Sequence, residues 1–150
     1  MANRYFLADV NVWLATIVEA HPHHAAAIRW WQERVVPSDQ RVAFCRVTQL
    51  GLLRLLTNER VMGPQRKTIA EAWSIYVRAL AAKQVVFTPE PEGTEAMLAE
   101  HCRLGGSPGK FWTDGYLAAV ARAGSLGLVT FDRDFERFPK LDLTRLVPES

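Results

Sequence analysis

Three aspartates could perform metal-dependent chemistry if the fold brings them together. Asp9 and Asp132 each follow a short apolar run, and Asp114 stands near the start of a helical pattern. Three carboxylates in one cleft repel one another unless a cation neutralises them. Oxygen ligands select a hard ion, so we expect Mg²⁺, with Mn²⁺ as a substitute. A water activated by such an ion is the candidate nucleophile for attack on a phosphoryl group.

The elements around these aspartates explain why they should meet. Residues 5–8 and 128–131 are predicted strands, and each is followed directly by one of the aspartates. The third aspartate is expected in the first turn of a helix over 113–123. In a parallel α/β layer, the carboxyl ends of strands and the starts of the following helices lie at one edge of the sheet. We therefore expect the three carboxylates at that edge.

The rest of the chain continues the alternation of strands and helices. Further helices are predicted over 10–20, 22–35, 47–56, 65–83 and 94–104, and further strands over 42–45, 85–87 and, weakly, near 146–147. This pattern is typical of a three-layer α/β/α fold with a central parallel sheet of about four or five strands. At 150 residues the chain fits a single domain, residues 1–150.

Composition narrows the function classes. Apolar residues make up 49% and charged residues 23%, the balance of a folded globular protein. No apolar stretch reaches the ~20 residues that a membrane crossing needs, and Asp9 precedes any signal-peptide core, so a cytoplasmic location is expected. Cys45 and Cys102 are too few for a disulfide framework or a zinc cage. The net charge of +2 is too small to indicate nucleic-acid binding by itself.

Each aspartate alone also has an ordinary structural explanation. Carboxylates at helix starts cap free N–H groups, and Asp132 could belong to a simple turn. Three at one edge favour a metal site over three separate caps. His21, His23 and His24 follow the first predicted helix and are expected at the opposite edge, outside this cluster.

Four motifs in a fixed order resemble a known family. They are LADVN at 7–11, FCRVTQLG at 44–51, WTDGYLAA at 112–119 and TFDRDF at 130–135. Together they resemble the PIN-domain ribonucleases, specifically the toxin subunits of VapBC-type toxin–antitoxin systems. The resemblance implies a Mg²⁺-dependent endoribonuclease that cuts structured RNA, tRNA or rRNA, and halts translation until a VapB-type antitoxin blocks it. It also implies a homodimer.

The resemblance assigns roles residue by residue. The family's metal-site acids correspond to Asp9, Asp114 and Asp132, with Asp134 as a further ligand, and Asn11, Gln49 and Thr130 support them. From their positions near the same edge, the residues predicted to contact RNA phosphates are Arg46, Lys110, Arg133 and Arg137.

Gln49 departs from the family pattern, which usually has Glu there. Gln carries no charge, so one tightly held ion is favoured over two. Glu59 cannot replace the missing carboxylate, because ten helical residues place it roughly 15 Å away.

Two other functions stay open. Gln49 would also suit a non-catalytic RNA-binding or regulatory module with the same fold. A haloacid-dehalogenase-like phosphatase also places an Asp after its first strand, but that family needs a second Asp where Asn11 stands.

Overall fold

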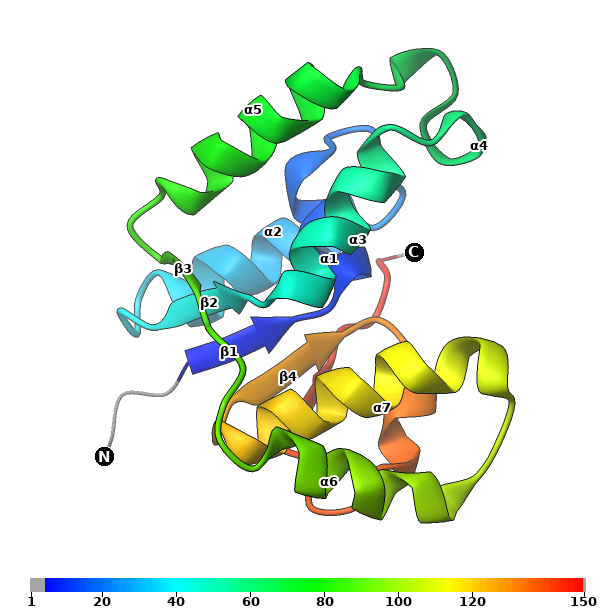
Figure 1. Ribbon diagram of the computed structural model, residues 1–150. Coiled ribbons are helices and arrows are strands. Elements are labelled where there is room, and N and C mark those ends of the chain that lie inside the picture. The colour runs from blue at the N-terminus through cyan, green and yellow to red at the C-terminus, as the bar shows by residue number, and fades with distance from the viewer. Residues whose placement is uncertain (1–4, 150) are drawn as a thin grey trace.

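A five-stranded parallel sheet forms the middle layer of the computed structural model, which describes residues 5–149 (Figure 1). Its strands are β1 (Tyr5–Ala8), β2 (Arg41–Phe44), β3 (Val85–Phe87), β4 (Gly127–Thr130) and β5 (Leu143–Arg145), in the order β3-β2-β1-β4-β5. β2 and β3 lie on one side of β1, and β4 and β5 lie on its other side. The β1–β4 boundary is therefore a topological switch point, the usual ligand position in such sheets. The predicted parallel sheet is confirmed.

Seven α-helices surround the sheet within the described residues. They are α1 (Val10–Ile17), α2 (His24–Trp30), α3 (Arg46–Leu56), α4 (Glu59–Met62), α5 (Ile69–Leu80), α6 (Thr94–His101) and α7 (Pro108–Ala123). A π-helical turn, η1 (Trp31–Val35), extends α2, and short 3₁₀ turns occur at η2 (Gly63–Gln65), η3 (Cys102–Leu104) and η4 (Arg133–Arg137).

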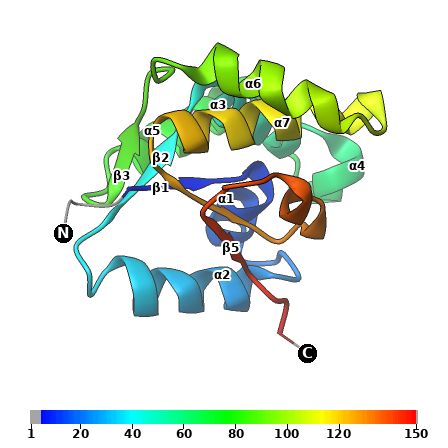
Figure 2. The ribbon, with the colours of Figure 1, turned by 90° about the horizontal axis from the view of Figure 1, so that it is seen from below.

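The alternation of side chains along the strands separates two hydrophobic cores. In β1, Phe6 and Ala8 pack with α1, α2, α3 and α5, while Leu7 packs on the other face with α7. Figure 2 shows α7 lying between α6 and the sheet. All four residues of β4 are buried, as expected for an inner parallel strand covered on both faces. The three-layer α/β/α prediction is confirmed.

The first helix ends earlier than predicted. Val18 adopts an extended backbone after Ile17, so α1 is eight residues long and spans only about 12 Å. The turn that follows therefore does not reach the far edge of the sheet. The ring of His23 lies 4.8 Å from that of Phe131, directly before Asp132, so the predicted position of this histidine at the opposite edge is wrong.

Helix α7 begins earlier than predicted, at Pro108 instead of residue 113. Proline suits the first turn of a helix, because its missing N–H would have no partner there. Asp114 consequently lies in the second turn, and the prediction that it lies in the first turn is wrong. The earlier start also makes Lys110 helical, one turn before Asp114.

Gly51 allows close packing of two helices near the site. A Cβ added to Gly51 in α3 would lie 2.6 Å from Cγ2 of Val10, so the glycine lets α3 approach the start of α1 closely. Cys45 and Cys102 are both free thiols. Between residues 5 and 149, no helix has the length and apolar character required to cross a membrane.

Candidate metal centre

The hydroxyl of Thr130, the fully buried last residue of β4, links two of the aspartates. It donates to Oδ2 of Asp9 at 2.8 Å and accepts from the backbone N–H of Asp132 at 3.0 Å. Oδ1 of Asp9 accepts from the backbone N–H of Val10 at 2.7 Å and caps α1. The carboxylate of Asp9 is therefore fixed from both sides.

The segment after β4 is held in a similar way. Oδ1 of Asp132 accepts from the backbone N–H of Asp134 at 2.9 Å, which starts turn η4. Oδ1 of Asn11 accepts from the backbone N–H of Phe131 at 3.5 Å, so α1 contacts this segment directly. Asn11 and Thr130 thus support the predicted ligands through hydrogen bonds.

Asp114 brings a third carboxylate to the same place from α7. Its residue is only 5% exposed, and its Oδ2 has no hydrogen-bond partner among the described residues. Nζ of Lys110 lies 3.9 Å from this oxygen. Buried carboxylate oxygens are normally paired, so this atom indicates a place for a ligand.

Lys110 places its ammonium among the carboxylates. It donates to Oδ2 of Asp132 and, at 3.1 Å, to Oδ2 of Asp134, in addition to its proximity to Asp114. From the sequence Lys110 is predicted to contact RNA phosphates, and these contacts with carboxylates are not predicted. Lys110 and Asp114 are four residues apart, which is the spacing of neighbours on one helix face, but this spacing applies only because α7 begins at Pro108 and includes Lys110.

Burial and mutual repulsion disfavour ionisation of two aspartates. Burial raises the pKa of Asp9, against the hydrogen bonds from Thr130 and Val10 that lower it, while the charge of Asp132 raises it further. Burial also raises the pKa of Asp114 to about 6; the charge of Lys110 opposes this shift, and those of Asp9 and Asp132 add to it. These two groups are costly to hold as anions without a cation.

Lys110 has the opposite effect on Asp132. Burial acts to raise the pKa of Asp132, but the hydrogen bond from Lys110 and the backbone N–H of Asp134 outweigh it and hold the pKa below its ordinary value. The pKa of Lys110 is itself raised: partial burial acts to lower it, and its hydrogen bonds to Asp132 and Asp134 outweigh that effect. The two groups therefore stabilise each other's charged form.

Gln49 and Arg46 interact with each other at the start of α3. Oε1 of the buried Gln49 accepts from the guanidinium of Arg46 at 2.6 Å. The guanidinium lies 4.7 Å from the ring centre of Phe87, at the end of β3. Among the described residues no hydrogen bond joins Gln49 to an aspartate, so its support of the metal ligands stays a prediction.

The two remaining basic residues belong to turn η4. Arg133 is exposed, and the guanidinium of Arg137 lies 5.5 Å from the ring centre of Phe111 and 4.9 Å from that of Phe138. Together with Arg46 and Lys110, they place positive charge around the carboxyl edge of the sheet.

The donor chemistry of the aspartates fits a hard divalent cation. Carboxylate oxygens are the ligands that Mg²⁺ and Mn²⁺ prefer, and Oδ2 of Asp114 lacks a partner. Over residues 5–149, however, no three Asp, Glu, His or Cys side chains already surround a common position for an ion. The ammonium of Lys110 lies between the carboxylates of Asp114, Asp132 and Asp134.

Comparison with known sequences gives matches along nearly the whole chain. The model of the PIN domain family matches residues 6–141. Ribonuclease VapC41 of Mycobacterium tuberculosis is 38% identical over 144 residues, which cover 93% of this chain and 97% of the relative. Ribonuclease VapC31 of the same organism is 33% identical over 135 residues, covering 89% and 92%.

Comparison with solved structures supports the fold independently. A chain in the crystal structure of VapBC2 from Rickettsia felis, bound to a promoter DNA fragment, matches with a TM-score of 0.67 at 15% identity, covering 95% of this chain and 98% of that one. VapC20 of Mycobacterium tuberculosis, described as a sarcin-ricin loop cleaving toxin, matches with a TM-score of 0.61 at 18% identity, covering 93% and 98%.

Replacing Asp114 by Asn should change how stability depends on pH in the metal-free protein. The pKa of Asp114 is about 6 in the folded state against 3.8 for the ordinary group, so its contribution to stability is present below about pH 4 and is lost as the pH rises through 6. The stability gained by Asp114→Asn should therefore be larger at pH 8 than at pH 5, by about 1 kcal/mol.

Urea unfolding in EDTA at both pH values measures this difference. Asp39→Asn is the control, because Asp39 is exposed and precedes β2 at the opposite edge. A gain that is equal at the two pH values, or larger at pH 5, would contradict the assignment of a strained anion at Asp114.

Proposed function

Because the chain belongs to the PIN domain family, we propose that it is the toxin endoribonuclease of a type II toxin–antitoxin system. The reaction is hydrolysis of phosphodiester bonds in structured RNA, either tRNA or rRNA, and the outcome is inhibition of translation. The observation that carries the proposal is the buried, unpartnered oxygen of Asp114 beside Asp9 and Asp132. Asp9 and Asp132 also cap α1 and turn η4, but capping does not account for the buried, unpartnered oxygen of Asp114 beside them.

The metal is Mg²⁺, with Mn²⁺ as a substitute, held by Asp9, Asp114 and Asp132 with help from Asp134. When bound, it supplies an activated water and neutralises charge on a phosphoryl oxygen. Thr130 orients Asp9, and Asn11 holds the segment that carries Asp132. Because Gln49 adds no charge and is engaged by Arg46, one ion is favoured over two.

The RNA backbone crosses the carboxyl edge of the sheet in this proposal. Arg46, Arg133 and Arg137 follow or adjoin the ends of β2 and β4 and supply positive charge on both sides of the carboxylates. Contacts to phosphates position an RNA without reading its sequence, so these residues determine where the RNA lies and not which base is cut.

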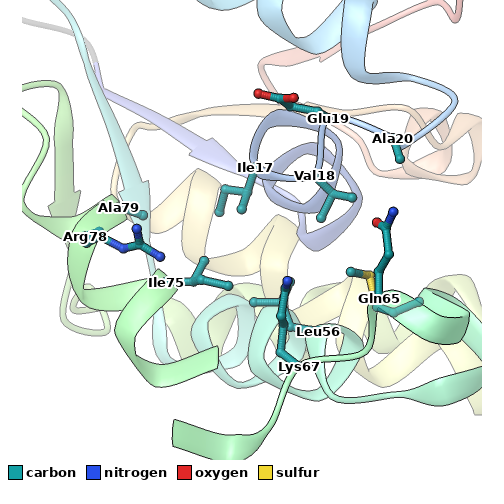
Figure 3. Close-up of a pocket in the computed structure, with 11 residues that line it drawn as sticks. Ile17, Val18, Glu19, Ala20, Leu56, Gln65, Lys67, Ile75, Arg78 and Ala79 are labelled. Atoms are coloured by element: carbon teal, nitrogen blue, oxygen red, sulfur yellow. The ribbon is translucent and has the colours of Figure 1, made fainter. Parts of the chain in front are cut away.

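The partner is a VapB-type antitoxin, as the VapBC structures of this fold support. A cavity of about 650 Å³ between the end of α1, α3, α4 and α5 offers a place for it, and none of the aspartates lines it (Figure 3). Ile17 and Val18 face Leu56 and Ile75 across this cavity. Its apolar walls suit the apolar face of a partner helix.

The charges at this cavity favour a partner that is not a second copy. Lys67 and Arg78 line it, and Figure 3 shows Glu19 pointing away from its centre. Two copies docked here would oppose their own positive charges, whereas acidic side chains of an antitoxin would complement them.

A different surface suits the homodimer. Ile69, Trp73 and Val77 are exposed at successive turns of α5 and form an uncharged apolar stripe, which is complementary to itself about a twofold axis. Light scattering of the purified chain gives its oligomeric state.

We place the protein in the cytoplasm, where its RNA substrates are.

Loss of one metal ligand should abolish cleavage while leaving the fold intact. Asp9→Asn keeps a good helix cap for α1 but removes a charge from the site. Since even residues that only support metal ligands contribute 10- to 100-fold, we expect cleavage of total cellular RNA to fall at least about 100-fold. EDTA should have the same effect on the unmodified protein, and sequencing of the new 5′ ends identifies the cut RNA.

Asp39→Asn is again the matched control and should retain activity. Cleavage that survives both EDTA and Asp9→Asn would rule out the proposal. Binding of RNA without cleavage under every metal condition would favour the regulatory module, and a phosphoenzyme trapped on Asp9 would favour the phosphatase.

Reversing the charges at the cavity should weaken the antitoxin complex selectively. We expect the double variant Lys67→Glu, Arg78→Glu to bind its antitoxin at least about tenfold more weakly in biolayer interferometry, because two favourable charge contacts become repulsive. RNA cleavage without antitoxin should not change. Arg103→Glu, an exposed substitution beside α6, is the control. Unchanged affinity in the double variant would place the antitoxin elsewhere.

A further inference from the structure

We propose that Lys110 is a resident counter-ion of the metal centre, and that a divalent cation must displace its ammonium in order to bind. The inference rests on the metal site proposed above and adds a competitor to it. Lys110 lies in the first turn of α7, one turn before Asp114 on the same face of the helix.

The contacts of the ammonium are those expected of a cation in this site. Nζ contacts Oδ2 of Asp132, lies 3.1 Å from Oδ2 of Asp134 and lies 3.9 Å from Oδ2 of Asp114. One positive charge thus lies near three carboxylates, one from α7 and two from the segment after β4. An ammonium is a compact point charge with three donors, so it can occupy a position between carboxylates as a small metal ion does.

The site needs such a charge when no metal is present. Asp114 is buried, and Asp9 and Asp132 act on it as like charges. Uncompensated buried charges are strongly unfavourable, and the ammonium compensates part of this cluster from within the chain.

The same ammonium is able to leave. The side chain of Lys110 is 53% exposed and carries its charge on a flexible four-carbon stem, so it can turn into solvent without disturbing α7. A metal ion would use the Oδ2 atoms that Lys110 occupies, so the two cations exclude each other. The displaced ammonium then lies at the basic edge, where it can contact an RNA phosphate.

Calorimetric titration with MgCl₂ and MnCl₂ tests the competition. Lys110→Met removes the ammonium and keeps a long apolar stem. If the metal must displace the ammonium, this variant should bind Mg²⁺ about tenfold more tightly than the unmodified protein, a change of about 1.4 kcal/mol. Lys110→Arg keeps the charge and should retain most of the competition. Lys83→Met is the matched control, because Lys83 is 75% exposed and pairs with Asp39 at the opposite edge.

Thermal unfolding gives a second readout that does not depend on activity. In EDTA, Lys110→Met should melt below the unmodified protein, because its carboxylates lack a counter-ion, and Mg²⁺ should raise its melting temperature by more. Equal or weaker Mg²⁺ affinity in Lys110→Met, with binding intact in the unmodified protein, would overturn this inference alone. No metal binding by either protein would overturn the metal site and, with it, the competition.

Discussion

The geometry of the site depends on the two hydrogen bonds that the hydroxyl of Thr130 makes. This hydroxyl is fully buried and joins Asp9, after β1, to Asp132, after β4. The two strands are parallel neighbours in register, so the residues that follow them meet at the switch point of the sheet. A buried hydroxyl that both donates and accepts fixes two groups at once. Asp114 and Lys110 then complete the site from α7.

This arrangement brings Asp9, Asp114 and Asp132 close enough for their negative charges to act on one another. Burial raises the pKa values of Asp9 and Asp114, while Lys110 holds that of Asp132 down. Shifts in opposite directions within one cluster are characteristic of functional sites. They agree with membership of the PIN domain family and explain why a cation, either the ammonium of Lys110 or a metal, is central to the proposed chemistry.

The parallel sheet and the meeting of the aspartates at its edge could be predicted from the sequence, because the strands near Asp9 and Asp132 are short apolar runs that end at a carboxylate. The start of α7 could not, since Gly105, Gly106 and Gly109 around Pro108 are typical of a loop. Because the predicted helix began at residue 113, Asp114 was expected in the first turn and Lys110 was expected outside the helix. The early end of α1 could not be predicted either, because the apolar Val18 follows Ile17 without a helix-breaking residue, yet it packs against the core with an extended backbone.

We expect the carboxylates at the β1–β4 edge to hold a divalent cation. A crystal grown or soaked with Mn²⁺, with data collected at an energy where manganese scatters anomalously, tests it directly. We expect one anomalous peak within coordination distance of Asp9, Asp114 and Asp132, with the side chain of Lys110 turned away. A peak elsewhere, or none in a crystal whose carboxylates are accessible to solvent, would contradict it.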